Sequence, residues 1–551
     1  MSITPIIEDH SFLAEELLIP NANKTDGSRM NMVCSQFSQL LVMNHAEPPL
    51  VFSNFENQIA SISSGLVTVK ENAEVAAVLP YNDCRALVLL KYDTGVLDLV
   101  EYKFATNLTE SFGYTSESMI EDIGQKFKKG DTLFYNGMYD EHRNFQYGNN
   151  LRTVYLPFKG KTYEDAIVIS ESAAKLLSHT TVTQYLVVLN RNDVCVYDVP
   201  KVGEEIKDGV LTARRRISNQ TILDSFKNDE FGVLRPGDTP FFGNGIITDV
   251  EVMCNTPEDL EFPYNAYFKE VYENQNALYE NLLETLNSKK LSKLKLSDNA
   301  LFWKRKAEDI LDPEIKFEYD KREFEGIVVR VDVVEEHECE IGSKLTGRYG
   351  NKGVVSLILP DEEMPRTEDG RYADVVSNSL GIIGRLNPSQ LFEHELNFIT
   401  EELHRRNDTL DGFTDEILTF YSMINPKYYD FLMSDAVSEE TLEELLADMY
   451  ETGLVPVEQA PFFGNAGIKE MQDLYSHFKI DKVKFENIQT PLVFGRMYFT
   501  KLKHEPMKKM STRSTGLTSL LDIPYKSSES YKRGNSLYNN NPVKMGNYLP
   551  M

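Results

Sequence analysis

The sequence predicts a mixed α/β protein of several domains with a β-rich core. Its 551 residues exceed the number that one hydrophobic core usually organises. Apolar, β-branched runs at 326–334 and 354–359 are typical of buried strands. One long helix is expected over 268–288, where apolar residues recur at helical spacing: Phe268, Val271, Leu278, Leu282 and Leu286.

The N-terminal part of the chain alternates between turns and short regular elements. Residues 1–60 mix short helical patterns with turns, and short β-like runs are expected at 63–69, 86–91 and 96–104. A Lys-Lys-Gly-Asp turn at 128–131 precedes another expected strand.

The middle of the chain is rich in strand signals. Residues 166–170 (AIVIS) predict a buried strand directly after two acidic residues. Further strands are expected over 185–254, with turns at 207–209 (Lys-Asp-Gly) and 235–238 (Arg-Pro-Gly-Asp).

Helices are expected again towards the C-terminus. Asn387-Pro-Ser-Gln390 supplies an N-cap, a proline at the first helical position and a glutamine at the third, so a helix should run from there to about residue 405. Residues 439–451 predict an acidic amphipathic helix that only presents a solvated face. The last 36 residues, rich in Ser, Asn, Tyr and Lys, predict a partly extended tail that a partner orders.

Composition excludes several classes of protein. No apolar run approaches the ~18 residues of a membrane span, and the acidic start of the chain lacks the basic region of a secretion signal. The scattered cysteines, none in a CxxC pair, indicate a reducing compartment without a disulfide framework or a zinc site. They are Cys34, Cys84, Cys195, Cys254 and Cys339.

The net charge of −28 argues against a nucleic-acid binder that uses its whole surface. However, the segment from Arg496 to Met551 contains ten lysines and arginines against three acidic residues. This distribution suits a protein that grips nucleic acid in one internal channel, although acidity alone more often indicates only solubility.

Residues 342–353 (GSKLTGRYGNKG) place three cations among four glycines, between two expected strands. Glycine allows a close approach of backbone to ligand, and Lys344, Arg348 and Lys352 carry groups that hold phosphates. The segment is not a P-loop, because Arg348-Tyr349 follows where Lys-Ser/Thr is required. We interpret it as a loop that binds a polyanion, with a solvated basic hairpin as the alternative.

Two further patterns indicate a charged site. Glu164 and Asp165 precede a buried strand and offer oxygen ligands suited to Mg²⁺. Because neighbours in a strand point to opposite faces, at most one of them should face a given site; a strand-edge acid pair capped by backbone is the alternative. Arg385 precedes the expected helix start, where a guanidinium and a helix N-terminus both attract anions; an ion pair with Glu393 is the alternative.

Basic side chains interleave with Tyr498 and Phe499 near the C-terminus. This pattern fits a segment that grips a nucleic-acid backbone with little sequence readout. The residues are Arg496, Lys501, Lys503, His504, Lys508, Lys509 and Arg513.

Four blocks of the chain resemble, in the same order, the β subunit of multisubunit DNA-dependent RNA polymerases. They are GNNLRTVYLPFKGKTYEDAIVIS (148–170), GSKLTGRYGNKGVVSLILP (342–360), MPRTEDGRYADVVSNSLGIIGRLNPSQLFE (364–393) and FGRMYFTKLKHEPMKKMSTRSTG (494–516). A weaker match, DGSRMNMVCSQFSQLL (26–41), is similar to the fork region. The chain departs from the family at Ser343, Leu345, Thr346 and Tyr349, and none of these changes removes a cation.

The resemblance implies a double-psi β barrel with an inserted wall or flap. The implied regions are a fork-like region (1–60), an external-like β region (61–147), a first barrel part that binds the RNA–DNA hybrid (148–185), a wall or flap-like insertion (186–325), a second barrel part (326–510) and a clamp-like C-terminal segment (511–551).

The resemblance also assigns roles to residues. It implies that Glu164 and Asp165 lie near the incoming triphosphate, with Asp165 contacting a second Mg²⁺. Lys344 and Lys352 are implied to reach the RNA 3′ end, and Arg385 the triphosphate. Arg348 and the C-terminal basic residues are implied to bind nucleic acid. The main Mg²⁺ needs a NADFDGD loop, which this sequence lacks, so its ligands are expected on a β′-like partner and none directly on this chain.

The implied protein is the C-terminal half of a β subunit of a nucleotidyltransferase, split as in giant-bacteriophage polymerases and inactive alone. An organellar or other split β gene is the alternative. Its expected partners are a chain like the β N-terminal half, β′-like chains, a promoter-specificity factor, template DNA, RNA and NTPs, with no membrane. The expected location is the cytoplasm of an infected bacterial cell, with packaging in a virion as an alternative. A catalytically inert, β-derived nucleic-acid-binding scaffold is the alternative function.

Overall fold

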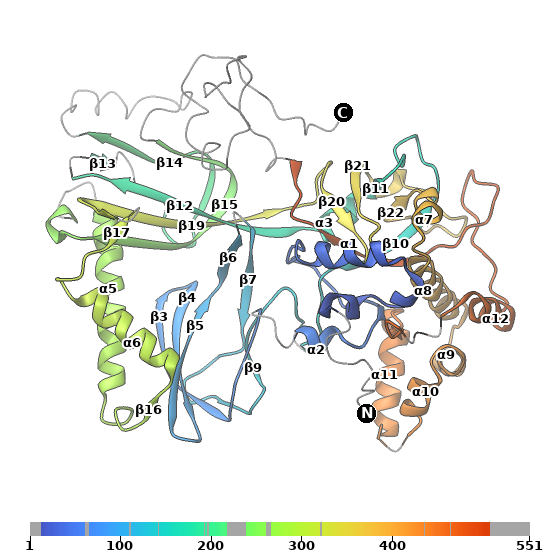
Figure 1. Ribbon diagram of the computed structural model, residues 1–551, viewed down its shortest axis with the longest axis horizontal. Helices are drawn as coiled ribbons and strands as arrows, with labels where there is room; N and C mark the ends of the chain where they lie inside the picture. Colours follow the sequence, from blue (N-terminus) through green and yellow to red (C-terminus); the bar gives the residue numbers. More distant parts are fainter. Residues whose placement is uncertain are drawn as a thin grey trace, which may run out of the picture. The chain divides into compact units, whose positions relative to one another are not determined.

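The chain divides into two units whose segments interleave along the sequence (Figure 1). Unit 1 comprises Met1–Ala60, Arg143–Ser178 and Glu338–Met551, and unit 2 comprises Ser61–His142 and His179–His337. The computed structural model describes residues 13–60, 65–109, 112–140, 143–191, 193–195, 198–216, 238–260, 266–319, 322–434, 436–462, 464 and 466–506. The expected tail (516–551) and clamp-like segment (511–551) lie outside these residues.

A closed six-stranded barrel forms the centre of unit 1. In order around the barrel its strands are β10 (Asn149–Tyr155), β22 (Val375–Ser377), β11 (Ala166–Ser170), β21 (Gly353–Leu359), β20 (Lys344–Thr346) and β24 (Gly495–Lys501). The pairs β10–β22 and β11–β21 are parallel, and the other four are antiparallel. Strands distant in sequence therefore meet in one barrel, whose apolar core includes Leu151, Ile169, Leu345, Val355 and Phe499.

The barrel confirms the AIVIS strand and revises the interpretation of the glycine-rich segment. That segment is more than a loop, because β20 lies within it and pairs with both β21 and β24. Only residues 347–352 connect β20 to β21.

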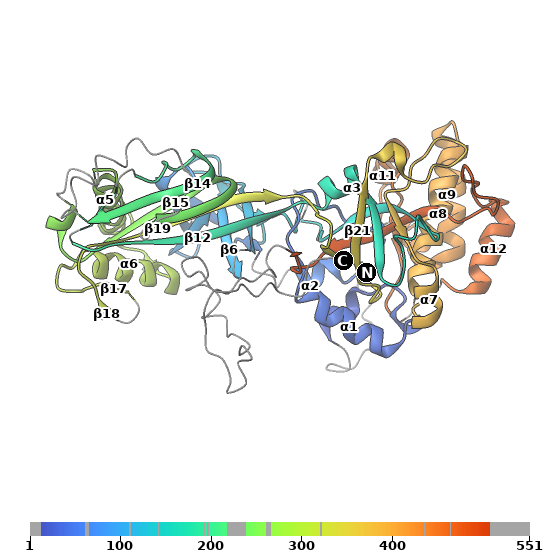
Figure 2. The same cartoon turned by 90° about the horizontal axis from the view of Figure 1, so that it is seen from above.

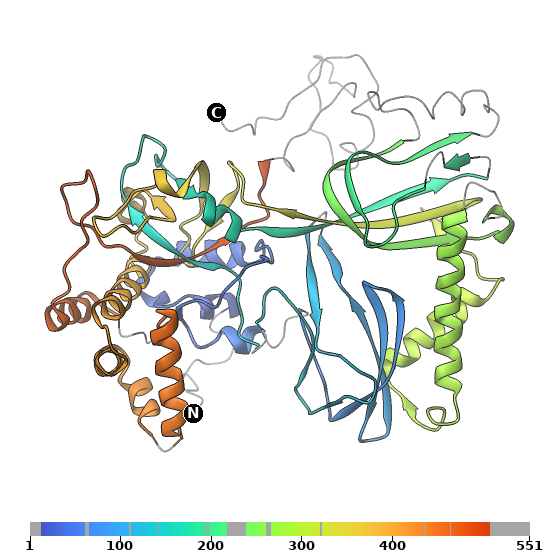
Figure 3. The same ribbon diagram turned by 180° about the vertical axis from the view of Figure 1, so that it is seen from behind.

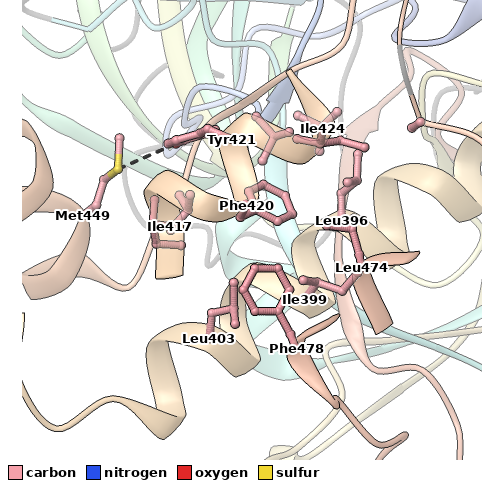
Figure 4. Close-up of a cluster of buried hydrophobic side chains, with 14 of the residues drawn as sticks. Leu396, Ile399, Leu403, Ile417, Phe420, Tyr421, Ile424, Met449, Leu474 and Phe478 are labelled. Atoms are coloured by element: carbon pink, nitrogen blue, oxygen red, sulfur yellow. Dashed lines mark hydrogen bonds between the residues drawn. The ribbon is translucent and has the colours of Figure 1, made fainter. Parts of the chain in front are cut away.

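A helical layer completes unit 1 (Figure 1). It consists of α8 (Ser389–Arg406), α9 (Leu410–Ile424), α10 (Pro426–Leu432), α11 (Glu439–Thr452) and α12 (Ile468–Phe478). Figure 4 shows Leu403 of α8, Phe420 of α9 and Phe478 of α12 in the shared apolar cluster. The acidic helix expected over 439–451 is α11, and it is more than a solvated face because Leu446 and Met449 are buried in this cluster.

Short elements surround the barrel and the helices. They are η1 (Ala14–Leu18), η2 (Ala22–Lys24), α1 (Gly27–Phe37), β1 (Val51–Phe52), α2 (Glu56–Ala60), α3 (Glu171–Leu176), η6 (Asp361–Glu363), α7 (Leu380–Arg385) and β23 (Val457–Glu458), which pairs with β1. The expected fork-like segment corresponds to α1, whose Gln36 accepts a hydrogen bond from Thr346 of β20.

Unit 2 is built on a nine-stranded sheet. Eight strands follow the order β13 (Asp193–Cys195), β14 (Glu205–Arg216), β15 (Asp238–Cys254), β19 (Ile327–His337), β12 (His179–Leu189), β7 (Phe112–Ser118), β9 (Thr132–Asn136) and β2 (Leu66–Thr68), and β6 (Ala105–Thr109) pairs with β7. Figure 2 shows β12, β14, β15 and β19 side by side.

A second sheet carries two helices. Its strands are β16 (Lys295–Leu296), β5 (Val96–Lys103), β4 (Arg85–Tyr92), β3 (Ala73–Asn82) and β8 (Lys126–Phe127). The long helix expected over 268–288 is α5 (Ala266–Asn287), which packs with α6 (Asp298–Leu311) on these strands (Figure 3). Unit 2 also contains η4 (Pro257–Leu260) and the pair β17 (Glu318–Tyr319) and β18 (Arg322–Glu323).

One expectation for unit 2 needs correction. The Lys-Asp-Gly pattern at 207–209 is not a turn: it is an irregularity within β14, where Gly209 has φ +149° and the register with β15 shifts. The same sheet joins β7, β9 and β2 of the expected external-like region to β14 and β15 of the expected wall-like region, with β12 and β19 between them. The turn expected at 235–238 falls largely outside the described residues.

Two further properties concern the whole described part of the chain. All five cysteines are free thiols. Among the described helices, none combines the length and the apolar character needed to cross a membrane.

The helical cluster makes a stability prediction. Phe420 is fully buried between α8, α9 and α12, so Phe420→Ala should lower the free energy of unfolding by about 3–5 kcal/mol through lost burial and a residual cavity. Phe431→Ala, at a side chain that is 41% exposed on α10, is the matched control and should cost much less. Denaturant unfolding measures both, and equal losses would contradict this packing.

His394 makes a pH prediction. Its Nε2 lies 2.8 Å from Thr153 O and accepts a hydrogen bond from Gly495 N at 3.0 Å, where β10 meets β24. Burial lowers the pKa of His394 from 6.5 to about 4. The unfolded chain therefore binds the extra proton first as the pH falls through 6.5, and unfolding should become easier by up to about 3 kcal/mol on approaching pH 4.

The matched variant for this prediction is His394→Gln, which cannot titrate. Other groups titrate in both proteins, so the difference between their unfolding free energies from pH 7 to 4 isolates His394. Parallel pH profiles would contradict the prediction.

Candidate functional site

Glu164 and Asp165 lie in a turn just before β11. Glu164 adopts the left-handed conformation (φ +53°), and Ala166 N donates to Tyr163 O at 3.1 Å. Both carboxylates are exposed, and both residues line the same pocket. The reason for expecting at most one of them to face a given site does not hold, because β11 begins at Ala166 and strand alternation does not apply to a residue pair that precedes the strand.

Gly353 brings β21 against this turn. Val354 N donates to Asp165 O at 2.8 Å, and a Cβ at Gly353 would lie only 2.5 Å from the same oxygen. Only glycine permits this approach without displacing backbone. As a result Lys352, immediately before Gly353, lines the pocket beside the two carboxylates.

Arg385 reaches the pocket from the last residue of α7. Its Nη1 forms an ion pair with Oδ1 of Asp165, and the two side chains are 28% and 44% exposed. Arg385 thus pairs with an acid, but with Asp165 and not with the expected alternative, Glu393. Four of the five residues expected to be catalytic, Glu164, Asp165, Lys352 and Arg385, meet here.

Lys344 is the fifth, and it does not line the pocket itself. It lies opposite Val354 of β21, which in turn lies opposite Ala166 of β11, a pocket residue. Two strand spacings of about 4.8 Å therefore separate Lys344 from Ala166 along one row of the barrel. Gly353, another pocket residue, lies on the adjacent strand opposite Leu345, the chain neighbour of Lys344. Within the described part of the chain, the ammonium groups of Lys344 and Lys352 make no hydrogen bond or ion pair.

A polar wall that the sequence did not reveal completes the pocket. Tyr155 OH donates to Gln390 Oε1 at 3.3 Å, Gln390 Nε2 donates to Asn387 Oδ1 at 2.8 Å, and Asn387 Nδ2 donates to Tyr349 O at 2.9 Å. Asn387 is therefore not the expected N-cap: α8 begins at Ser389, its N-cap is Pro388, and the amide of Asn387 holds the glycine-rich segment. In the sequence, the Asn-x-x-Gln spacing was the only sign of the hydrogen bond between Asn387 and Gln390.

Arg348 lies in the interior and not in the pocket. Its side chain is 1% exposed, and Nη2 donates to Glu393 Oε2 at 2.8 Å. Burial disfavours the charge, but the carboxylate of Glu393 raises the pKa of Arg348 well above its ordinary value. This burial corrects the expectation that Arg348 binds nucleic acid, because the guanidinium is not accessible to phosphates in this structure.

The C-terminal basic pattern is also largely structural. Tyr498 and Phe499 are buried because β24 closes the barrel between β10 and β20. Lys501, which is fully buried, pairs with Glu505 at 3.2 Å and donates to Glu338 O at 3.1 Å, so the expectation of a phosphate contact does not fit it.

The other basic residues of this segment differ in exposure. Arg496 is partly buried and donates to Asn150 O at 3.3 Å, and half-buried His504 hydrogen-bonds Gln39. Lys503 is exposed. Lys508, Lys509 and Arg513 lie outside the described residues.

The site does not form a complete metal cage within the part of the chain that the structure describes. No group of three or more His, Cys, Asp or Glu side chains there could hold a metal ion. Glu164 and Asp165 can supply oxygen ligands from one side, in a pocket whose cationic groups suit an anionic ligand.

The close approach at Gly353 makes a prediction. Gly353→Ala should lower the free energy of unfolding by about 1–3 kcal/mol, because the added methyl group displaces β21 from the carboxylate turn. Gly384→Ala is the control: its Cβ would meet no atom within 4 Å, and helix propensity should leave stability unchanged or raised by about 0.5–1 kcal/mol. Denaturant unfolding distinguishes the two, and equal effects would contradict the close approach.

Comparison with known proteins agrees with the resemblance read from the sequence. The family described as RNA polymerase Rpb2, domain 6, matches residues 124–523. The DNA-directed RNA polymerase subunit beta of Thermus aquaticus is 28% identical over 518 residues, which cover 92% of this chain and 42% of that protein. The corresponding subunit of Mycoplasmopsis synoviae is 24% identical over 513 residues, covering 91% and 35%.

The chain thus spans about two-fifths of the length of the curated relatives it matches, which is consistent with the expected C-terminal half of a β subunit. The family match covers well over half of the chain. The chain belongs to the RNA polymerase Rpb2 domain 6 family.

Proposed function

We propose that this chain is the C-terminal part of a β subunit in a multisubunit DNA-dependent RNA polymerase and supplies one side of its nucleotidyl-transfer site. The observation that carries the proposal is the convergence of Glu164, Asp165, Lys352 and Arg385 on one pocket, in a chain of the RNA polymerase family. We also propose that the six-stranded barrel is the family's double-psi β barrel; its mixture of parallel and antiparallel pairs supports this.

The proposed chemistry depends on position and charge. Phosphoryl transfer requires the reacting groups to be aligned and the negative charge on the phosphate oxygens to be neutralised. Arg385 binds the triphosphate of the incoming NTP, and its planar fork suits two phosphate oxygens. Lys352 and Lys344 provide point charges for the RNA 3′ end and the reacting phosphates, and neither is committed to a partner among the described residues.

Glu164 and Asp165 are the groups of this chain that would contact a metal ion. Bound Mg²⁺ neutralises charge that develops on the phosphates. Asp165 and Glu164 are the residues of this chain that would face a second Mg²⁺, and their oxygens fit that role. Because the described residues hold no group of three such ligands, the remaining ligands come from a β′-like partner.

The proposed partners follow from membership of the RNA polymerase family. They are β′-like chains, a chain like the N-terminal half of β, a promoter-specificity factor, template DNA, RNA and NTPs. Exposed Lys503 is the described C-terminal cation best placed to meet a nucleic-acid backbone. The proposed setting is the cytoplasm of an infected bacterial cell.

The proposal predicts that the purified chain makes no RNA with Mg²⁺, NTPs and template, whereas its complex with the β′-like partners does. In that complex, Lys352→Ala and Arg385→Ala should each slow single-nucleotide extension about tenfold or more, about 1.4 kcal/mol per tenfold. Arg385→Ala should mainly raise KM for NTP, because it removes a triphosphate contact.

Lys161→Ala is the matched control, since Lys161 is an exposed lysine of the segment before Glu164 that does not line the pocket; its variant should extend RNA normally. RNA synthesis by the isolated chain would overturn the proposal. An assembled complex that binds nucleic acid but never extends RNA would favour the inert scaffold.

A further inference from the structure

We propose that the pocket binds a divalent cation and a polyphosphate by exchange. The Asp165–Arg385 ion pair separates, Asp165 turns to the cation and Arg385 to the phosphate, so that each ligand binds weakly without the other. This inference rests on the proposed function and adds a coupling between the two ligands.

The pair occupies the groups that both ligands need. Arg385 is the pocket's only arginine among the described lining residues, and its guanidinium contacts Asp165. Asp165 in turn commits one carboxylate oxygen to Arg385. In the pocket without ligands, the two charged groups therefore neutralise each other. Both side chains are partly exposed.

A polyphosphate without a cation meets an electrostatic penalty. To bind Arg385 it must displace Asp165, and the carboxylate then remains next to a polyanion, with Glu164 beside it. Like charges at such short range disfavour one another. Lys352 and Lys344 still attract the ligand, so binding is weakened and not abolished.

A cation without a polyphosphate meets the opposite penalty. To reach Asp165 it must displace Arg385, which would then face the cation and Lys352 without an anionic partner. When both ligands arrive together, each half of the broken pair gains a partner of opposite charge. The two bindings are therefore positively coupled, and the coupling is reciprocal.

The chain contains its own control for this idea. Glu164 and Asp165 are neighbours, both are exposed, and both line the pocket, but the ion pair is formed by Asp165. Asp165→Asn and Glu164→Gln remove the same charge from the same turn. Simple electrostatics predicts similar effects, whereas exchange predicts different ones.

The experiment titrates inorganic tripolyphosphate into the full chain, by calorimetry, with EDTA or with excess Mg²⁺. Mg²⁺ should tighten binding to the wild type about tenfold, within the usual range for coupled sites. Asp165→Asn should tighten metal-free binding and lose most of the Mg²⁺ effect, because Arg385 is already released. Glu164→Gln should raise metal-free affinity less and keep the Mg²⁺ effect.

A double variant completes the test. If the additional effect of Asp165→Asn acts through Arg385, then in the Arg385→Ala background Asp165→Asn should raise metal-free affinity no more than Glu164→Gln does, because only the like-charge repulsion is then removed. Equal behaviour of Asp165→Asn and Glu164→Gln, with tripolyphosphate still bound, would overturn the exchange and leave the proposed function intact. No binding by any variant, with or without Mg²⁺, would overturn both the exchange and the assignment of the pocket.

Discussion

The ion pair between Arg348 and Glu393 is the contact on which the arrangement of unit 1 depends. Glu393 lies on α8, where Oε2 accepts hydrogen bonds from Arg348 Nη2 and Tyr349 OH, and Oε1 accepts one from Tyr498 N at 2.7 Å. One buried carboxylate thus joins the glycine-rich segment, α8 and β24. The guanidinium also lies over the ring of Tyr498, 5.1 Å from its centroid. Removing one partner of such a buried pair typically costs about 3–5 kcal/mol, because the other charge is left uncompensated.

The position of the pocket follows from this contact. Once Glu393 fixes the first turns of α8 against the glycine-rich segment, Asn387 and Gln390 are held in the polar wall with Tyr155. Arg385, two residues before Asn387, is then directed to Asp165 across the pocket. Gly353, also a pocket residue, sets β21 against the carboxylate turn. The charged groups of the site are therefore placed by packing around them and not by contacts with one another alone.

The sequence predicted the elements of the site better than its geometry. Periodicity was sufficient for the AIVIS strand and for α5, because a buried strand and an amphipathic helix depend on local pattern. It could not distinguish Arg348 from Lys352, since a buried and an accessible cation have the same sequence signature when the partner, Glu393, is distant in the chain. Lys501 was misassigned for a different reason: its ion-pair partner Glu505 is only four residues away, but its burial depends on β24 pairing with β10 and β20, which are distant in the chain. The Lys-Asp-Gly pattern that ends at Gly209 resembled a turn. In the structure these residues continue β14, and the register of its pairing with β15 shifts there.

Two arginine–carboxylate pairs in unit 1 show how burial separates structural from exchangeable contacts. The Arg348–Glu393 side chains are each 1% exposed, whereas those of Arg385 and Asp165 are 28% and 44% exposed. Solvent screens the Arg385–Asp165 pair, so its contribution to the free energy of unfolding is of the order of 0–1 kcal/mol. This is small compared with the cost of breaking a buried pair. A ligand that supplies new partners can therefore separate Arg385 from Asp165 while Arg348 and Glu393 stay joined. The same type of ion pair therefore holds the glycine-rich segment to α8 where it is buried, and can exchange its partners for ligands where it is exposed.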